Sequence, residues 1–213
     1  ADDQAKTRIN DLVSGAKPFP IHEGKCGILL YGTSGTGKSA LAKLLPKAME
    51  MNRTGKDVGD DAIFESIEAG NNGASVLTKI QNAAQYYPVQ ASLHYFVLDE
   101  VDNLNPDAMK NLKSTMNARD SVFILTTNYF QKINPAVVSR CHCIEFNKAP
   151  DENWLPIAKH ILHDEGISGI TDVALLAVIK QANGDARNIL DGIQDLVLNV
   201  YRSQQVVLTR PAK

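Results

Sequence analysis

The sequence predicts an α/β protein with a parallel five-stranded sheet between two layers of helices, followed by a small all-helical domain. Apolar runs of strand length alternate with segments of helical periodicity up to Pro150, and this order favours parallel strands joined by helical crossovers. Beyond Pro150 the pattern changes to three helical segments without a strand. We therefore expect an α/β domain at residues 1–149 and a helical domain at residues 150–213.

The expected strands are short apolar runs bounded by turn residues or by helical patterns. They occupy residues 26–31, 62–68, 93–98, 121–125 and 141–146. The expected helices carry apolar residues at helical spacing, and Asn105 and Pro106 are typical cap and first-turn residues of one of them. The others lie within residues 1–16, 40–51, 74–86, 154–165, 172–182 and 185–201. Residues 52–60 favour a loop, and residues 206–208 favour a short strand or a tail.

Composition and charge exclude several classes of protein. The 213 residues are 44% hydrophobic and 22% charged with a net charge of −2, so nucleic acid would have to be bound by a local basic patch. No apolar run approaches the roughly 20 residues that span a bilayer. The chain begins at Ala1 without a signal peptide, and we expect a processed or trimmed product. An odd count of three cysteines indicates reduced thiols and an intracellular location, in the cytoplasm, the nucleus or a virus-infected cell.

Cys141, His142 and Cys143 form a cluster with two interpretations. Thiols and imidazole are common metal ligands. The cluster also lies in an alternating run, in which a strand would place both cysteines on one face and His142 on the other. No second pair of ligands lies nearby in the sequence, so we favour a buried strand in which the cysteines pack as small apolar residues.

Residues 32–39 match the phosphate-binding pattern G-x-x-x-x-G-K-[ST], and they lie between an expected strand and an expected helix. Gly35 and Gly37 would let the backbone wrap a phosphate, toward which loop N–H groups and the helix N-terminus point. Lys38 would reach the β- and γ-phosphates, and the Ser39 hydroxyl would ligate Mg²⁺. The expected nucleotide-binding residues of this segment are Thr33, Ser34, Gly35, Thr36, Gly37, Lys38, Ser39 and Ala40.

Two further expected strands end in residues suited to the same site. Asp99 and Glu100 follow an apolar run, and ligands of open α/β sheets bind at the carboxyl ends of strands. Asp99 is therefore placed to hold Mg²⁺, and Glu100 to orient or deprotonate the attacking water. Asn128 ends the next strand, where its amide would hydrogen-bond the γ-phosphate or the water. A solvated acidic pair and a polar turn residue are the alternatives.

Two arginines have unusual positions. Arg140 ends a short helical stretch just before a strand, where it would reach the γ-phosphate of a neighbouring subunit or simply interact with the helix C-terminus. Arg187 falls in the first turn of a helix that Asp185 caps, which is unfavourable for a cation beside the helix dipole. A bound anion would explain Arg187, and a surface arginine is the alternative.

The order of these motifs resembles that of AAA+ ATPases, with Walker A, Walker B, sensor 1, Ser-Arg-Cys and sensor 2 segments in turn. The matching segments are residues 32–39, Asp99-Glu100, Thr127-Asn128, Ser139-Arg140-Cys141 and Gly184-Asp185-x-Arg187. The chain is similar, over roughly residues 20–200, to the small subunits of sliding-clamp loaders of the replication factor C type. The resemblance implies a three-layer AAA+ sandwich followed by a helical lid, an oligomeric ring that is homo- or heteromeric, and ATP with Mg²⁺.

The resemblance also implies roles for single residues. Arg140 would act as a finger in trans and Arg187 as a sensor in cis, so the expected catalytic set is Lys38, Glu100, Asn128, Arg140 and Arg187. Primer–template DNA and a sliding clamp would be partners, and a membrane would not. The candidate DNA contacts are Asn72, Ser75, Lys79, Lys110 and Lys113, with solvated helix faces as the alternative.

The chain departs from the family's pattern in three respects. The family's Glu-Lys-Tyr-Arg-Pro-like opening, which bears on how adenine is held, is missing. The family's helical collar domain follows the lid, and we expect it to be missing because the chain ends soon after Arg187. Ser114 and Asn117 also replace an expected basic and an expected acidic residue. The sequence favours an ATP-hydrolysing motor subunit acting on DNA in replication. A helicase or helicase loader, and a nucleotide-gated assembly subunit without turnover of its own, stay open.

Overall fold

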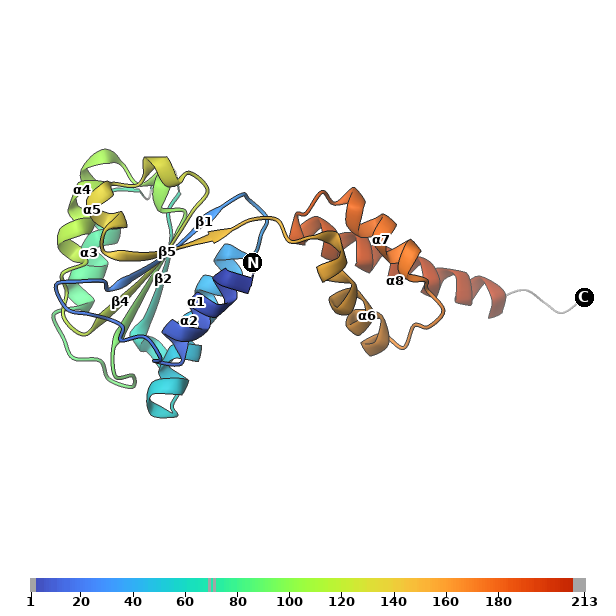
Figure 1. Cartoon of the computed structure of the whole chain (residues 1–213), viewed down its shortest axis with the longest axis horizontal. Coiled ribbons are helices and arrows are strands. Elements are labelled where there is room, and N and C mark those ends of the chain that lie inside the picture. The colour runs from blue at the N-terminus through green and yellow to red at the C-terminus, as the bar shows by residue number, and fades with distance from the viewer. Residues whose placement is uncertain (1–2, 69, 71, 209–213) are drawn as a thin grey trace, which may run out of the picture. The chain divides into compact units, whose positions relative to one another are not determined.

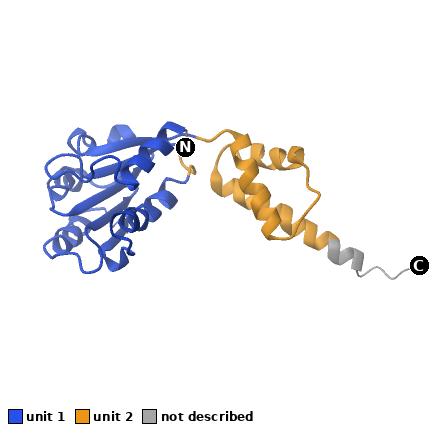
Figure 2. Ribbon diagram, turned by 60° about the horizontal axis from the view of Figure 1, so that its bottom comes forward, with its two compact units in different colours: residues 1–33, 37–147 blue, residues 34–36, 148–213 orange. Residues whose placement is uncertain are grey.

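The computed structural model describes residues 3–68, 70 and 72–208. It divides into two compact units, one formed by Ala1–Thr33 with Gly37–Asn147 and the other by Ser34–Thr36 with Lys148–Lys213 (Figure 2). Among the described residues, no helix combines the length and the apolar character needed to cross a bilayer.

The first unit is built on a five-stranded sheet in which every pair of neighbouring strands is parallel, as predicted. The spatial order is β2-β3-β4-β1-β5. The strands are β1 (Gly27–Gly32), β2 (Ala62–Ser66), β3 (His94–Asp99), β4 (Ser121–Thr127) and β5 (Cys141–Phe146). All carboxyl ends therefore lie along one edge of the sheet, and all amino ends along the other.

Helices cover both faces of this sheet (Figure 1). One face carries α1 (Asp3–Val13) and α2 (Lys38–Thr54), and the other carries α3 (Ala74–Ala83), α4 (Pro106–Thr115) and the short α5 (Pro135–Val138). The Asn105 side chain accepts a hydrogen bond from the Ala108 N–H at 2.8 Å and caps α4, with Pro106 in the first turn as expected. Helix α2 extends past the predicted end at Met51, because Gly55 in a left-handed conformation ends it.

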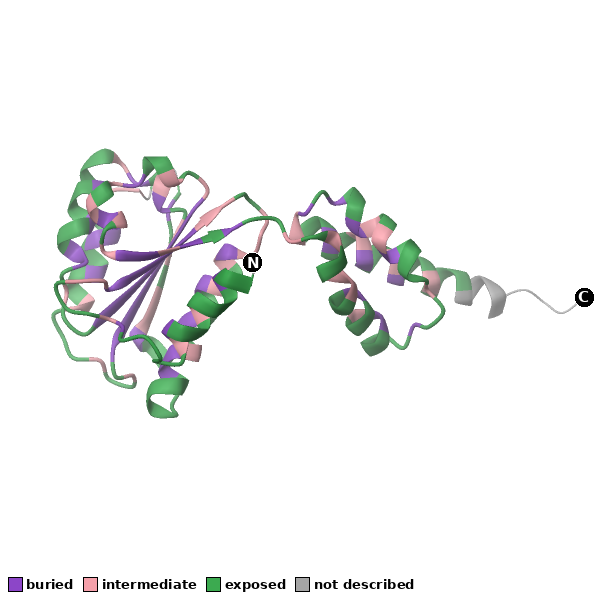
Figure 3. Ribbon diagram, in the orientation of Figure 1, coloured by how far each residue is buried: buried purple, intermediate pink, exposed green. Residues whose placement is uncertain are grey.

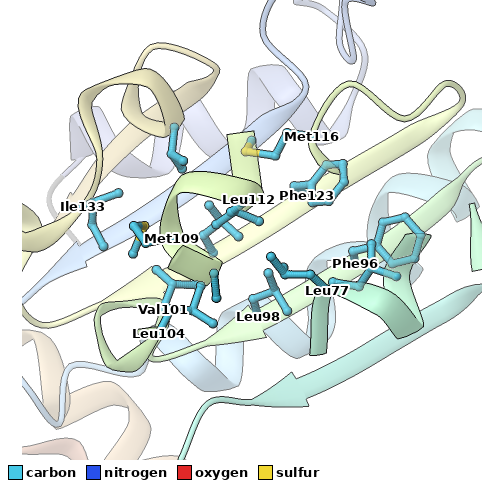
Figure 4. Close-up of a cluster of buried hydrophobic side chains, with 14 of the residues drawn as sticks. Leu77, Phe96, Leu98, Val101, Leu104, Met109, Leu112, Met116, Phe123 and Ile133 are labelled. Carbon is cyan, nitrogen blue, oxygen red and sulfur yellow. The ribbon is translucent and has the colours of Figure 1, made fainter. Parts of the chain in front are cut away.

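Strand alternation divides the interior into two cores, and the sheet between them is the most buried part of the unit (Figure 3). Phe96 and Leu98 of β3 point into the core beneath α3 and α4, where they meet Leu77 and Leu112 (Figure 4). Tyr95 and Val97, which alternate with them along β3, pack in the core on the side of α2 instead. Side chains two residues apart along a strand thus face the same helix layer. This alternation determines which polar residues of neighbouring strands can contact each other.

Strand β5 shows this alternation at the cysteine cluster. Cys141 and Cys143 pack on the core beneath α3 and α4, whereas His142 faces the other side, where its ring lies 5.5 Å from that of Phe19. Burial lowers the pKa of His142 to about 4, so this imidazole is neutral at pH 7. The described residues contain no group of three or more histidine, cysteine, aspartate or glutamate side chains arranged to hold a metal.

The second unit contains α6 (Leu155–Asp164), α7 (Asp172–Gln181) and α8 (Ala186–Leu208), which enclose an apolar core of their own. The predicted short strand or tail at residues 206–208 is wrong, because these residues continue α8. A strand needs a partner for its backbone hydrogen bonds, and the described part of this unit has none, whereas a helix satisfies its own. The fold is thus an α/β sandwich followed by a helical unit, as the sequence predicted.

Helix α2 is tied to β3 by a buried carboxylate. Glu50 is fully buried and accepts hydrogen bonds from the Ser92 N–H, the Ser92 hydroxyl, the Thr54 hydroxyl and the Tyr95 hydroxyl, at 2.9–3.0 Å. Burial alone would raise the pKa of Glu50, but these hydrogen bonds to the ionised form outweigh it and lower the pKa below its usual value.

Replacing Glu50 by glutamine should lower the free energy of unfolding at pH 7 by about 1–3 kcal/mol, because several buried donors lose a charged acceptor. A pKa lowered in the folded state stabilises above the unfolded-state pKa, and that stabilisation is lost as the pH falls through the folded-state pKa. Urea denaturation of both proteins should therefore show the difference shrinking in acid. Glu145→Gln, at an exposed position of β5, is the matched control and should change little. Equal stability of Glu50→Gln and wild type at pH 7 would contradict this role.

Candidate nucleotide-binding and catalytic site

The glycine-rich loop leaves β1 at the carboxyl edge of the sheet and leads into α2. Gly35 and Gly37 have φ values of 76° and 90°, in the region that glycine adopts without strain. Gly37 is also the N-cap of α2, and no side chain caps this helix. The first turn of an α-helix leaves N–H groups without an intrahelical acceptor, and such a helix N-terminus favours a bound anion.

Gly32, the first residue of the loop, must be glycine for a different reason. Its φ is 136°, and a Cβ atom at this position would overlap the Phe146 carbonyl group of β5. Any side chain would therefore force the loop and β5 apart. The structure explains the first glycine of the motif by the packing of neighbouring strands.

Lys38 is buried although it carries a charge. Its Nζ donates hydrogen bonds to the carbonyl oxygens of Gly32, at 3.2 Å, and of Thr33, at 2.7 Å. The ammonium group is thus held at the loop, where a phosphate bound to the backbone would meet it. Ser39 follows in the first turn of α2 and is half-buried.

The two acidic residues at the end of β3 share one partner, Thr126 of the neighbouring strand β4. The Thr126 hydroxyl donates to Asp99 Oδ1 at 2.5 Å and accepts the Glu100 N–H at 3.0 Å. A single buried hydroxyl therefore fixes the Asp99 carboxylate and the backbone of Glu100. At the end of β4 only Asn128 was expected to have a role, although a threonine two residues earlier on this adjacent strand was a usable signal.

Glu100 has a left-handed backbone, with φ 59° and ψ 48°. Such a conformation is uncommon outside glycine, and residues in sparsely populated backbone regions cluster at functional sites. Its side chain is exposed, and Oε2 accepts a hydrogen bond from Asn103 Nδ2 at 3.1 Å. The same amide donates to the Ile67 carbonyl at 3.0 Å, just beyond β2. No sequence pattern pointed to Asn103.

Ser39 and Asp99 line one pocket of about 200 Å³ at this edge. Asp99 Oδ1 is bonded to Thr126, and Oδ2 has no hydrogen-bond partner within the described part of the chain. A hydroxyl and a carboxylate oxygen suit Mg²⁺, which usually takes one or two carboxylates, several waters and substrate phosphates. The residues present therefore fit this ion, and Ser39 with Asp99 would hold it.

Asn128 directly follows β4 and is half-buried, without a hydrogen bond from its side chain to any described residue. It therefore lies at the same edge as the loop, Asp99 and Glu100. The sequence predicted that several residues of the first unit contact a nucleotide bound by the same chain. The structure places all of them at this edge.

Arg140 lies at the opposite edge. It comes directly before β5, whereas the glycine-rich loop is beside the end of that strand, since Gly32 pairs with Phe146. The length of β5 separates the two by about 17 Å. Arg140 Nε donates to Asn117 Oδ1 at 3.3 Å, and Nη1 donates to the Ala136 carbonyl at 3.0 Å. These contacts hold the guanidinium near the ends of α4 and α5.

Arg187 belongs to the second unit and lies in the first turn of α8, as predicted. Asp185 caps this helix, because its Oδ1 accepts the N–H groups of Arg187 at 2.8 Å and of Asn188 at 3.4 Å. The Arg187 side chain is exposed, and no described residue pairs with it.

The candidate DNA contacts lie on or beside α3 and α4, which pack against each other. Lys79 pairs with Glu65 at 3.0 Å, Lys110 lies 3.9 Å from Asp107, and Lys113 is exposed. Ser75 is exposed in the first turn of α3, and the Asn72 carbonyl accepts the Asn105 N–H at 2.9 Å. The five residues thus share one layer of the first unit.

Comparison with known proteins places these residues in context. Replication factor C small subunit 2 of Pyrobaculum islandicum is 28% identical over 90% of this chain and 57% of its own length. The replication factor C small subunit of Methanosarcina acetivorans is 32% identical over 87% of this chain and 54% of its own. The chain therefore spans little more than half the length of the curated relatives it matches.

The fold is also that of known structures. The RuvB Holliday junction branch migration motor of Thermotoga maritima superimposes with a TM-score of 0.68 over 97% of this chain and 64% of that one, at 18% identity. The model of the ATPase family associated with various cellular activities (AAA) matches residues 28–148, from β1 to just beyond β5. Since this match covers more than half of the chain and includes the loop, Asp99, Glu100 and Asn128, the chain belongs to the AAA ATPase family.

Proposed function

We propose that the chain is the ATP-binding and ATP-hydrolysing part of a ring subunit that acts on DNA in replication, most like a sliding-clamp loader small subunit. One observation carries this proposal. The phosphate loop, Asp99 and Glu100 lie at the carboxyl edge of the sheet, while Arg140 lies at the amino edge. A complete site of this kind then needs the Arg140 of a second subunit.

Each residue at the carboxyl edge has a chemical task in this proposal. Loop N–H groups and Lys38 bind the phosphates, and Ser39 with Asp99 hold Mg²⁺. Bound there, Mg²⁺ would neutralise charge on the β- and γ-phosphate oxygens. Glu100 orients the attacking water and accepts its proton, and Asn128 hydrogen-bonds the γ-phosphate or the water.

We propose that residues 150–213 form the helical lid that the resemblance implies. Arg187, exposed at the N-terminus of α8, would bind the γ-phosphate in cis. DNA would contact the α3–α4 layer through Asn72, Ser75 and the three lysines. A phosphate that pairs with Lys79 must replace Glu65, whose side chain is 12% exposed against 63% for Lys79.

The amino edge of the sheet offers a surface for a protein partner. Tyr86, Tyr87 and Val89 are 74%, 87% and 89% exposed. The segment is held firmly: His94 Nε2 lies 2.9 Å from the Tyr86 carbonyl, and Asp61 accepts the N–H groups of residues 89–91. Exposed aromatic residues on a fixed backbone are typical of protein interfaces. Since the family resemblance implies a sliding clamp as a protein partner, we propose that the clamp binds here.

Experiments distinguish the proposed function from the two alternatives that the sequence leaves open. A helicase or helicase loader would separate strands in a fork assay, and the likeness to RuvB shows the fold alone. A nucleotide-gated assembly subunit would bind ATP without turnover under any condition, including primed DNA with a clamp. The geometry of Glu100 favours turnover.

Replacing Glu100 by glutamine should preserve ATP binding and reduce turnover by a factor of about 10² or more, because the amide cannot accept the proton of the water. Equilibrium binding of a fluorescent ATP analogue and steady-state phosphate release measure the two effects separately. Glu145→Gln, at an exposed position of β5, is the matched control. Normal turnover in Glu100→Gln would remove Glu100 from the catalytic role.

Replacing Arg140 by alanine should reduce turnover by a factor of about 10³–10⁵ without weakening ATP binding to the same chain. The decisive experiment mixes the Arg140→Ala protein with the Glu100→Gln protein, each of which should be inactive alone. If Arg140 acts across an interface, the mixture regains activity, since Glu100→Gln supplies the arginine and Arg140→Ala supplies the intact pocket. Arg119→Ala, at an exposed position near the same edge, serves as control. A mixture that stays inactive under conditions where wild type assembles would contradict the role in trans.

The double variant Tyr86→Ser, Tyr87→Ser should weaken binding of the cognate sliding clamp about tenfold or more, while ATP binding is unchanged. Leu44→Ser, which removes an exposed apolar side chain from α2 on the other face, is the control. Surface plasmon resonance against immobilised clamp in the presence of ATP gives the affinities. Equal clamp binding by the double variant and wild type would place the clamp elsewhere.

A further inference from the structure

A row of polar side chains crosses three strands at the carboxyl edge of the sheet. Ser66 of β2 pairs in register with Asp99 of β3. On the other side, Leu98 pairs with Leu125 of β4, so the next residue, Thr126, lies beside Asp99. The Asp99 carboxylate is thus flanked by two hydroxyl groups, one on each neighbouring strand.

All three side chains of this row point to the same face of the sheet, because neighbouring residues in register share a face and alternate residues repeat it. Val97 packs in the core beneath α2, so Asp99 faces α2 as well. Ile124 packs in the same core, which places Thr126 on that face. The face is the one whose helix carries Ser39, the other expected Mg²⁺ ligand.

The two hydroxyls differ in what they bind. Thr126 is buried and already donates to Asp99 at 2.5 Å. Ser66 is exposed, and its hydroxyl has no hydrogen-bond partner within the described part of the chain. Ser66 nonetheless lines the same 200 Å³ pocket as Ser39 and Asp99. The polar lining of the pocket therefore consists of two expected ligands of the ion, Lys43, Glu65 and one hydroxyl without an assigned task.

We propose that Ser66 is a positioning residue for the Mg²⁺ of the nucleotide site and hydrogen-bonds a water ligand of that ion. Mg²⁺ dehydrates reluctantly and keeps several waters, so a polar group one water beyond the protein ligands can orient the hydrated ion. Thr126 fixes the Asp99 carboxylate from one side, and Ser66 holds the water from the other. The inference rests on the proposed nucleotide function and adds a residue that the motifs do not contain.

The test measures metal affinity and needs no turnover. The whole chain is incubated with a fluorescent, non-hydrolysable ATP analogue, and MgCl₂ is titrated into chelator-treated samples. Substitution of a residue that orients metal ligands typically costs 10–100-fold in metal affinity. Ser66→Ala should therefore raise the half-saturating Mg²⁺ concentration by a factor of about 10, with analogue binding in EDTA unchanged. Ser66→Thr keeps the hydroxyl and should restore the wild-type value, and Ser114→Ala on the exposed side of α4 is the control.

Asp99→Asn and Thr126→Val calibrate the same titration, and the urea midpoint of each variant shows that it is folded. If Asp99→Asn shifts the Mg²⁺ requirement but Ser66→Ala does not, the role of Ser66 is overturned while the proposed function stands. If Ser66→Ala and Ser66→Thr shift it equally, the effect is steric and the inference also fails. If wild type binds no ATP analogue at any Mg²⁺ concentration, the proposed function itself is wrong.

Discussion

The parallel direction of all five strands is the constraint on which the arrangement of the site depends. It gathers the chemistry of β1, β3 and β4 at one edge, where the phosphate loop, two carboxylates and Asn128 meet. The same constraint sends Arg140 and the aromatic pair Tyr86 and Tyr87 to the other edge, because they precede β5 and β3. A subunit built this way presents the residues that we propose bind nucleotide at one end of its sheet, and Arg140 near the other.

Within the carboxyl edge, the finer geometry depends on contacts between neighbouring strands. The Thr126 hydroxyl joins the Asp99 side chain to the Glu100 backbone, and Glu100 is held in a left-handed conformation beside it. Asn103 then connects the Glu100 carboxylate to the residue that follows β2. A shift of β2 or β4 relative to β3 would therefore change the positions of the two acidic residues. We infer that the sheet itself fixes the spacing between Asp99 and Glu100.

The features that could be predicted from the sequence are those that depend on residues close together in the chain. The phosphate loop, the acidic pair, Asn105 as a cap and Asp185 as a cap each depend on neighbours a few positions away, and the structure has each of these local geometries. The strand count and the parallel direction followed from the alternation of strands and helices. The AAA family followed from the order of the motifs along the chain, and the family match confirms it.

The sequence did not predict contacts that depend on register between strands. Ser66 and Thr126 flank Asp99 only because β2 and β4 are its neighbours, which no local pattern states. Glu50 is a similar case, since a glutamate on a helix is usually solvated and its four donors come from three separate places in the chain. The short strand or tail expected at residues 206–208 is wrong, because these residues continue α8 and a strand would need a partner strand.

In our proposal, the pocket of one chain is completed by Arg140 of a second chain. The most direct measurement is the ATPase rate per chain as a function of protein concentration, with the mass of the assembly determined at each point. The account predicts a low rate for the monomer and a rise that follows the appearance of oligomers. A full rate that is independent of concentration, in a sample shown to be monomeric, would contradict it.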